Sequence, residues 1–187
     1  RDDPILTMSN MGTPVDDADI IQGMTMAAEI FITLKKMGFP VTGVYTPPEC
    51  SCSTVVISTK VPYTNIASRI AGGVWASAVG HFVVKIIIVD DDVDPTNMRE
   101  VLHAWSTKCH PIRGTTIIPQ AVMTPAYPYY SPEEQKYNQG VNVYYDCTWP
   151  KRWPKEHIAV RSSFRDIYPK EIQEKVLANW TRYGFKE

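Results

Sequence analysis

The sequence lacks an excess of positive charge, which excludes two classes of partner. Its 187 residues include 19 Lys and Arg against 20 Asp and Glu, for a net charge of −1. Binding to nucleic acids or to anionic membrane surfaces relies on clustered positive charge. A membrane helix needs about 20 apolar residues in a row, and the longest run here, residues 82–89, is interrupted by Lys85. We therefore expect no nucleic-acid partner and no membrane partner.

Cysteines and recognisable metal or nucleotide motifs are also scarce. The four cysteines are too few for a disulfide scaffold, and free thiols in a reducing cytoplasm are the simplest interpretation. A structural zinc site needs two regularly spaced ligand pairs, whereas Cys50-Ser51-Cys52 is a single irregular pair. Neither G-x-G-x-x-G nor G-x-x-x-x-G-K-S/T is present. The sequence predicts a cytoplasmic protein with no metal site in this chain.

The first half of the chain alternates between helix and strand patterns. Thr13-Pro14 is typical of a helix start, and Gly38 and Pro40 are typical of its end. Between them, apolar residues keep helical spacing at Ile20, Ile21, Met24, Phe31, Leu34 and Met37. Gly23 lowers helix stability by roughly 1 kcal/mol relative to Ala. We therefore expect a kink there, or a close approach by another segment.

The remaining patterns predict an α/β fold. Strands are expected at residues 41–46, 54–60, 81–90, 115–118 and 141–145, and further helices at 64–79, from Asp94 onward and at 169–183. The strand at 81–90 is apolar on both faces, which is typical of the centre of a parallel sheet. We therefore predict a mostly parallel sheet with helices on both faces, followed by a C-terminal helical arm. Residues 119–140, rich in Pro and Tyr, are too long for a free loop and are expected to lie on another surface.

An acidic run, Asp90-Asp91-Asp92-Val93-Asp94, follows the strand predicted at 81–90. Clustered carboxylates at the end of a buried strand are compatible with a Mg²⁺ site. The structural alternative is that Asp94 caps the next helix while the other carboxylates hold neighbouring loops. We favour the structural alternative, because no phosphate loop or second carboxylate motif accompanies the run.

Several motifs, in order along the chain, resemble those of the UbiD-like decarboxylases. They are Pro4–Met8 followed by Gly12, then Ala27–Ile30, Lys85–Asp94, Val101–Pro111, Tyr145–Pro150 and Tyr168–Phe185. The last of these is similar to the ending of the ferulic and phenolic acid members. The chain opens with Arg1 rather than Met and shows no signal-peptide pattern. We therefore expect it to be part of a longer protein.

The resemblance implies the C-terminal part of a reversible decarboxylase that acts on an aromatic or phenolic carboxylic acid. Members of the family use prenylated FMN, which an N-terminal domain holds with Mn²⁺ and K⁺. Their catalytic Arg and two acidic residues belong to that upstream domain. By analogy, no catalytic residue and no metal ligand is expected in this chain, which would be inactive alone as a carboxy-lyase.

The resemblance also predicts how the chain is divided. Residues 1–12 would end the upstream cofactor-binding domain, residues 13–168 would form the C-terminal α/β domain, and residues 169–187 would form an oligomerisation helix. One wall of the substrate pocket would be supplied by Met11, Ala18, Gln22, Met123, Thr124 and Ala126. Thr124 and Gln22 would hydrogen-bond a ring hydroxyl, and Met11 and Ala126 would shape the aromatic slot. A homo-oligomer is expected. The alternative is a non-catalytic α/β module used for assembly or binding.

Overall fold

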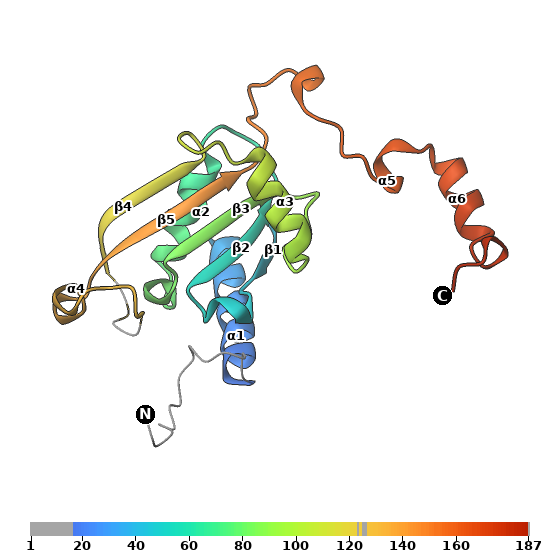
Figure 1. Ribbon diagram of the computed structural model, residues 1–187. Helices are drawn as coiled ribbons and strands as arrows, with labels where there is room; N and C mark the ends of the chain where they lie inside the picture. Colours follow the sequence, from blue (N-terminus) through green and yellow to red (C-terminus); the bar gives the residue numbers. More distant parts are fainter. Residues whose placement is uncertain (1–16, 123, 125–126, 187) are drawn as a thin grey trace. The chain divides into compact units, whose positions relative to one another are not determined.

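Five strands form one mixed sheet in the order β1-β2-β3-β5-β4, shown in the computed structural model of Figure 1. The structure describes residues 17–122, 124 and 127–186. The strands are β1 (Val41–Tyr45), β2 (Thr54–Thr59), β3 (Lys85–Asp90), β4 (Thr115–Val122) and β5 (Gln139–Cys147). β3 pairs in parallel with β2 and β5, whereas β1 and β4 pair antiparallel with their neighbours.

Strand direction follows from the connections. The parallel pair β2 and β3 is joined through a helix, as a parallel crossover requires. The antiparallel pair β1 and β2 is joined by residues 46–53, which contain only the short 3-10 helix η1 (Pro48–Cys50). The predicted α/β sheet with a parallel centre is therefore confirmed, and its edges are antiparallel.

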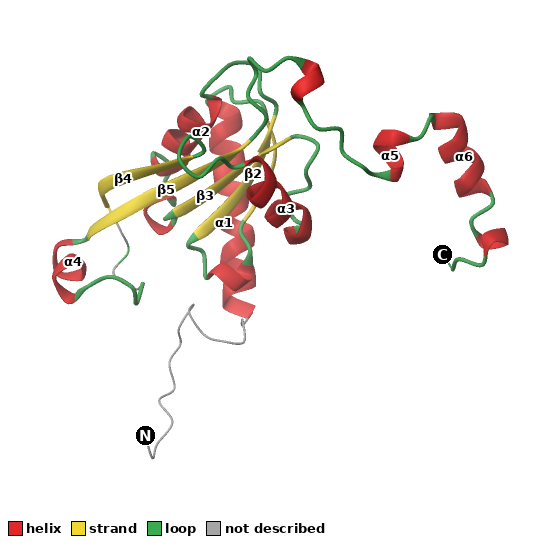
Figure 2. Ribbon diagram, turned by 45° about the horizontal axis from the view of Figure 1, so that its top comes forward, coloured by secondary structure: helices red, strands yellow, loops and turns green. Residues whose placement is uncertain are grey.

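Helices cover both faces of the sheet, as predicted. α1 (Asp17–Lys36) and α2 (Ile66–Trp75) lie on one face, and α3 (Met98–Lys108) lies on the other (Figures 1 and 2). Alternate side chains of β3 point to opposite faces, so Ile86 and Ile88 pack with α1 and α2 while Ile87 and Val89 pack with α3. This explains why the strand is apolar at every central position.

Two element starts differ from the predictions. β3 begins at Lys85, because residues 80–82 form the short 3-10 helix η2 (Gly80–Phe82) instead of extended strand. α3 begins at Met98, and Asp94 does not cap it. The Asp94 carboxylate instead accepts hydrogen bonds from the backbone N–H of Thr96 at 2.9 Å and from its hydroxyl at 2.8 Å. These two hydrogen bonds close a turn before the helix, and the helix therefore begins at a later residue than predicted.

The expectation that residues 119–140 lie on another surface is corrected for two of its tyrosines, which pack within the same unit; for the exposed residues it stays a prediction. β4 extends to Val122, β5 begins at Gln139, and α4 (Pro132–Tyr137) lies between them. Tyr127 and Tyr130 are buried against Val84 within the same unit. Tyr127 and Tyr130 therefore serve internal packing, whereas Tyr129 and Tyr137 are exposed, and the amino-acid composition of the segment does not distinguish the two cases.

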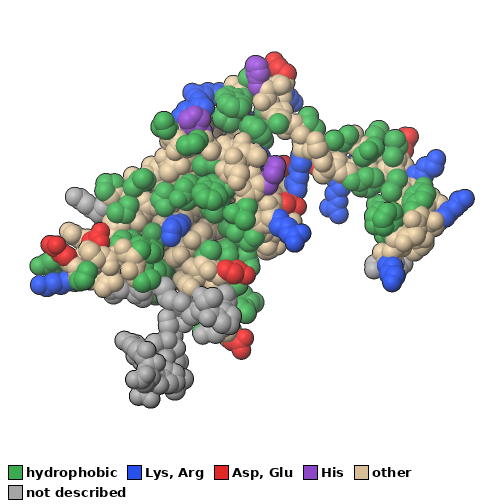
Figure 3. Space-filling view, viewed as in Figure 1, with side chains coloured by type: hydrophobic (Ala, Val, Ile, Leu, Met, Phe, Trp, Pro, Cys, Tyr) green, Lys and Arg blue, Asp and Glu red, His purple; other side chains and the backbone are tan. Residues whose placement is uncertain are grey.

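The chain divides into two compact units after Lys151. The second unit contains η3 (Lys155–His157), α5 (Phe164–Ile167), α6 (Lys170–Ala178) and η4 (Thr181–Tyr183). None of its described residues is buried, and Figure 3 shows many apolar side chains on its surface. The rings of Trp180 and Phe185 stack with centroids 4.3 Å apart. Across the described parts of both units, every helix is too short or too polar to cross a membrane.

Candidate functional site

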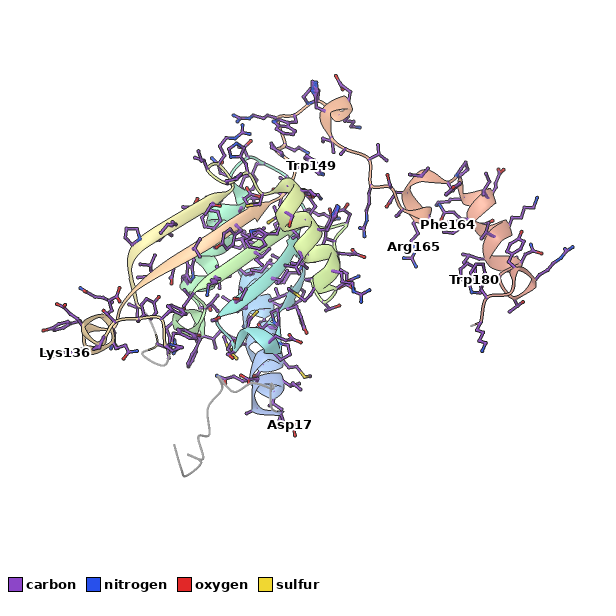
Figure 4. The ribbon with its side chains drawn as sticks, viewed as in Figure 1. Asp17, Lys136, Trp149, Phe164, Arg165 and Trp180 are labelled. Atoms are coloured by element: carbon purple, nitrogen blue, oxygen red, sulfur yellow. The ribbon has the colours of Figure 1, made fainter. Side chains whose placement is uncertain are left out.

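The candidate site lies at the edge of the sheet where β2 and β3 begin, here called the amino edge. Thr54 and Lys85, the first residues of these strands, are in register. Four segments meet there: the start of α1, residues 46–53, η2, and the described residues after β4, which are Thr124 and residues 127–130. Figure 4 shows Asp17 on α1 and Lys136 on α4 toward this end, and Trp149 at the opposite end.

The first turns of α1 pack closely on the segment that follows β1. Asp19 is completely buried, whereas its neighbour Ala18 is exposed and Gln22 is half-buried. A Cβ atom on Gly23 would lie 3.0 Å from the carbonyl oxygen of Thr46. The predicted close approach at Gly23 is therefore confirmed, and it fixes α1 against the end of β1.

A strained turn precedes β2. Ser51 and Cys52 have φ angles of 46° and 61°, in a left-handed region that costs non-glycine residues about 1 kcal/mol or more each. Ser53 holds the turn in place, since its N–H donates to the Cys50 carbonyl at 2.9 Å and its hydroxyl donates to the same oxygen at 2.7 Å. The Ser53 carbonyl accepts from the N–H groups of Val84 and Lys85, both at 2.9 Å. The turn is thereby attached to the entrance of β3.

Cys52 is buried within this turn. Its side chain is 3% exposed, and burial, with a smaller contribution from the Asp19 carboxylate, raises the thiol pKa to about 11. At neutral pH the thiol is therefore protonated. A protonated and inaccessible thiol is a poor nucleophile, so the site offers no cysteine-based covalent chemistry at this position.

The segment after β4 is bound to η2 through two side-chain hydroxyls. The Thr124 hydroxyl donates to the His81 carbonyl at 3.2 Å, and the Tyr127 hydroxyl donates to the Phe82 carbonyl at 2.5 Å. Burial raises the pKa of the Tyr127 hydroxyl, so this group remains a donor at neutral pH. Two consecutive carbonyls of η2 therefore set the position of the segment.

An aromatic stack with a cation lies beside this segment. The rings of Tyr127 and Tyr129 are stacked with centroids 5.6 Å apart and an angle of 3° between their planes. The Lys85 ammonium lies 4.9 Å from the centroid of the Tyr129 ring, within the range of a cation–π interaction. Lys85 thus places a positive charge at the amino edge, next to an exposed aromatic ring.

A mostly apolar groove of about 500 Å³ runs between α1 and β1. Its lining residues are Ile20, Gly23, Met24, Ala27, Ala28, Phe31, Val44, Tyr45, Thr46 and Pro48. At 3.6 residues per turn, Ala18 and Gln22 lie on the opposite side of α1 from Ile20 and Phe31. Three residues of the predicted apolar pattern, Ile20, Met24 and Phe31, line this groove. The face of α1 that packs on the core is a different one, and its buried residues are Asp19, Gly23, Met26, Ile30 and Leu34.

The acidic run lies at the opposite edge of the sheet and serves a structural purpose. The Lys108 ammonium is 2.7 Å from an Asp90 carboxylate oxygen and 3.8 Å from one of Asp92. The backbone N–H of Trp149 donates to both Asp90 oxygens at 3.3 Å. Within the described ranges, no group of three or more His, Cys, Asp or Glu side chains could hold a metal ion.

Three of the predicted wall residues can be located. Ala18, Gln22 and Thr124 all belong to segments of the amino edge, while Met11, Met123 and Ala126 lie outside the described residues. Sequence reasoning did not identify Asp19, Cys52 or Tyr127 as buried residues of this edge. The burial of Asp19 could have been predicted, because Asp19 has the helical spacing of the buried residues Gly23, Met26 and Ile30. For Cys52 and Tyr127 no local pattern distinguishes burial from exposure.

Comparison with known proteins identifies the class. The family model of the 3-octaprenyl-4-hydroxybenzoate carboxy-lyase C-terminal domain (UbiD) matches residues 19–147, more than half of the chain. The match covers all five strands and the helices α2, α3 and α4. The chain therefore belongs to the UbiD C-terminal domain family.

Individual relatives agree with this assignment. The pyrrole-2-carboxylic acid decarboxylase of Pseudomonas aeruginosa is 30% identical over an alignment of 193 residues, gaps included. The alignment covers 99% of this chain and 39% of that protein. The chain spans about two fifths of the length of the curated relatives it matches.

Two solved structures share the fold. The vanillic acid decarboxylase of Sedimentibacter hydroxybenzoicus in its open form has a TM-score of 0.74 and 24% identity, over 91% of this chain and 36% of that one. The UbiD-class enzyme HmfF of Pelotomaculum thermopropionicum, solved in complex with FMN, has a TM-score of 0.69 and 20% identity, over 87% and 34%.

Proposed function

We propose that this chain is the C-terminal part of a reversible decarboxylase that acts on an aromatic or phenolic carboxylic acid. The chain would work with an upstream domain that binds prenylated FMN, and its amino edge would form one wall of the substrate pocket. One observation carries the proposal: a decarboxylase of a heteroaromatic acid is 30% identical across 99% of the chain. The FMN held by a structural neighbour supports the choice of a flavin. A cytoplasmic location remains a prediction.

The described residues do not supply a metal site, so no step of the reaction is assigned to a metal on this chain. We assign Mn²⁺, K⁺ and the catalytic Arg and acidic residues to the upstream domain. A flavin bound by the upstream domain would supply an acceptor for the electron pair that departing carbon dioxide leaves on the substrate. The proposed role of this chain is to orient the aromatic acid and to exclude water from the pocket.

The side chains of the wall residues suit the role of orienting an aromatic acid. Thr124 already uses its hydroxyl proton in the bond to the His81 carbonyl. Its oxygen can therefore only accept a further hydrogen bond, which suits a phenolic O–H of the substrate. Gln22 carries both a donor and an acceptor, and the small side chain of Ala18 leaves room for an aromatic ring. The wall also includes Met11, Met123 and Ala126 in this proposal.

The direct test uses the full-length protein, made in cells that also supply prenylated flavin. Carbon dioxide release is measured with pyrrole, hydroxybenzoic and cinnamic acids. We expect release from at least one acid, and none from protein made without the flavin source. A flavin-loaded enzyme that converts none of the acids would contradict the proposed function.

The wall is tested by Thr124→Leu and Gln22→Leu in the same protein. Each is expected to change the ratio of kcat/KM between phenolic and non-phenolic acids about tenfold, since one lost hydrogen bond to a buried polar group is worth about 1 kcal/mol or more. Flavin content should not change. Thr107→Leu on the exposed face of α3 is the matched control, and a similar change in that control would show that the wall is misplaced.

The C-terminal unit has a separate proposed role. We propose that residues 169–187 bind a second copy of the protein through the apolar side of α6. The support is the lack of any buried residue in the described part of this unit, because an apolar helix face gains stability only when another surface covers it.

A further inference from the structure

The outer edge of β4 is open to a further strand. β4 is the last strand in the order β1-β2-β3-β5-β4, and Figure 1 shows it at the rim of the sheet. The backbone N–H and C=O groups on the outer side of such a strand face no other strand of the sheet. They form a template that an additional strand can pair with.

Hydrogen bonds of β5 determine which of its residues face β4. The N–H of Val143 donates to the carbonyl of Val84, just before β3, whereas the N–H of Asp146 donates to the carbonyl of Gly114, just before β4. The N–H and C=O of one residue point to the same side of a strand, and this side alternates from residue to residue. The even-numbered residues of β5 therefore direct their backbone groups toward β4.

The register then determines which residues of β4 face outward. Ile118 lies opposite Asn142, an even-numbered residue of β5, so the backbone groups of Ile118 point inward and bond to β5. The alternation along β4 leaves the backbone groups of Thr115, Ile117 and Pro119 on the outer side. Pro119 offers only its carbonyl there, since proline has no N–H, and its position agrees with the confinement of proline to edge strands.

The side chains of this edge do not oppose pairing. Terminal strands are commonly protected by charged side chains, but no Lys, Arg, Asp or Glu occurs between Arg113 and Glu133. Ile117, whose backbone groups point outward, also has a side chain that is 64% exposed. A partner strand would bury this isoleucine and would supply hydrogen bonds to the free backbone groups.

A second copy of the chain offers a matching strand. An open strand edge pairs with another open edge, and the outer strands of this sheet are β1 and β4. β1 ends against α1, where the Thr46 carbonyl oxygen is 3.0 Å from the position of a Cβ atom on Gly23. β4 of a second copy is therefore the better partner. Two copies of one strand related by a two-fold axis pair antiparallel, and this arrangement closes as a dimer.

We propose that β4 pairs antiparallel with β4 of a second copy, with Ile117 opposite its own equivalent. In this register the two Ile117 residues exchange both backbone hydrogen bonds, and each Thr115 N–H donates to the Pro119 carbonyl of the other chain. Pro119 acts only as an acceptor. A register with Ile117 opposite Pro119 would lose half of its bonds, because each pair would require the missing proline N–H. The pairing goes beyond the proposed function and depends neither on the reaction nor on α6.

The first experiment is site-specific cross-linking of the full-length protein. Directly opposite residues in such a pair have Cα atoms about 5.5 Å apart, so Ile117→Cys should give a covalent dimer with a short thiol cross-linker. Val122→Cys is the matched control, because Val122 lies on the same strand and is 69% exposed, yet its two copies would be about 30 Å apart. Peptide mass spectrometry distinguishes the new link from links through the four native cysteines. No link at position 117, or equal linking at position 122, would overturn the proposal.

The second experiment measures association. Ile117→Lys places two like charges opposite each other, which is unfavourable across a strand pair, and should weaken one step of self-association at least tenfold in sedimentation velocity. Val122→Lys adds the same charge to the same strand outside the paired segment and should leave association unchanged. Wild-type association of Ile117→Lys would contradict the proposal.

A combined variant separates this interface from the one proposed for α6. Leu177→Asp should leave the cross-link of Ile117→Cys in place, since the two contacts are independent. Loss of the cross-link in the combined variant would overturn an independent β4 interface. A wild type that forms the link but converts no aromatic acid would contradict the proposed function and leave the strand pairing supported.

Discussion

Lys108 and Asp90 form an ion pair that joins the end of α3 to the carboxyl end of β3, with 2.7 Å between the ammonium and a carboxylate oxygen. The two side chains are 11% and 14% exposed. Burial raises the pKa of Asp90 more than the hydrogen bond and charge of Lys108 lower it. The pair therefore reduces the cost of burying this carboxylate without fully offsetting it.

The first prediction concerns this pair. Because the pKa of Asp90 is raised on folding, the folded protein retains a proton that the unfolded chain has already lost above about pH 4. Stability should therefore fall as pH rises from about 4 until the folded carboxyl has also ionised. Lys108→Met should make this fall in the free energy of unfolding steeper and should lower that free energy by about 3 kcal/mol at pH 7. Urea unfolding across pH 4–7 measures both effects. The exposed Lys60→Met is the control, and an unchanged pH dependence in Lys108→Met would contradict the prediction.

The second prediction compares two helical glycines. Gly23→Ala places a Cβ atom 3.0 Å from the Thr46 carbonyl oxygen, and backbone must shift to relieve the contact. We expect a loss of about 1–2 kcal/mol despite the better helix propensity of alanine. Gly72→Ala on α2 meets no atom within 4 Å, so it should stabilise the protein by about 0.5–1 kcal/mol. Thermal unfolding of both variants measures the difference, and destabilisation by Gly72→Ala would refute the packing argument.

The third prediction concerns the thiols. Burial is the largest cause that raises the pKa of all four cysteines. Alkylation by iodoacetamide at pH 7.5 should therefore be slow in the folded protein, with Cys50 and Cys109, which are partly exposed, modified before Cys52 and Cys147. Peptide mass spectrometry over time gives the order. Early modification of Cys52 would show that the turn before β2 is more open than described.

The fourth prediction tests the C-terminal unit. Leu177 is 60% exposed on the apolar side of α6, and Leu177→Asp should weaken self-association of the full-length protein at least tenfold, as a charge in an apolar interface is strongly unfavourable. Sedimentation velocity over a concentration series measures the effect. Lys175→Asp, on the other side of the same helix, should leave association unchanged. If both variants associate like the wild type, α6 is not the interface.

The sheet and its helices could be predicted from the sequence because their signals are local. The apolar run of β3 indicates burial on both faces, and the Gly and Pro residues after α1 indicate its end. The start of α3 could not be predicted as readily. Asp94-Pro95 has the composition of a helix start, but a side-chain bond to Thr96 competes with capping.

The candidate site was predicted only in part, since its geometry depends on contacts between distant segments. The resemblance implies Ala18, Gln22 and Thr124 as wall residues, and this role stays a prediction, although all three belong to segments of one edge of the sheet. The burial of Tyr127 depends on Val84 and Phe82, more than 40 positions away in the sequence. No local pattern of residues 119–140 contains that information.

The central position of β3 also has a consequence for biosynthesis. Its apolar segment, residues 86–89, must pair with β2 on one side and with β5 on the other, and β5 is the last of the five strands of this sheet in chain order. Until residues 139–147 have been synthesised, one edge of this uncharged, β-branched segment stays open to other chains. Shortened chains that end before residue 139 should therefore aggregate, whereas chains that end after Cys147 can complete the sheet.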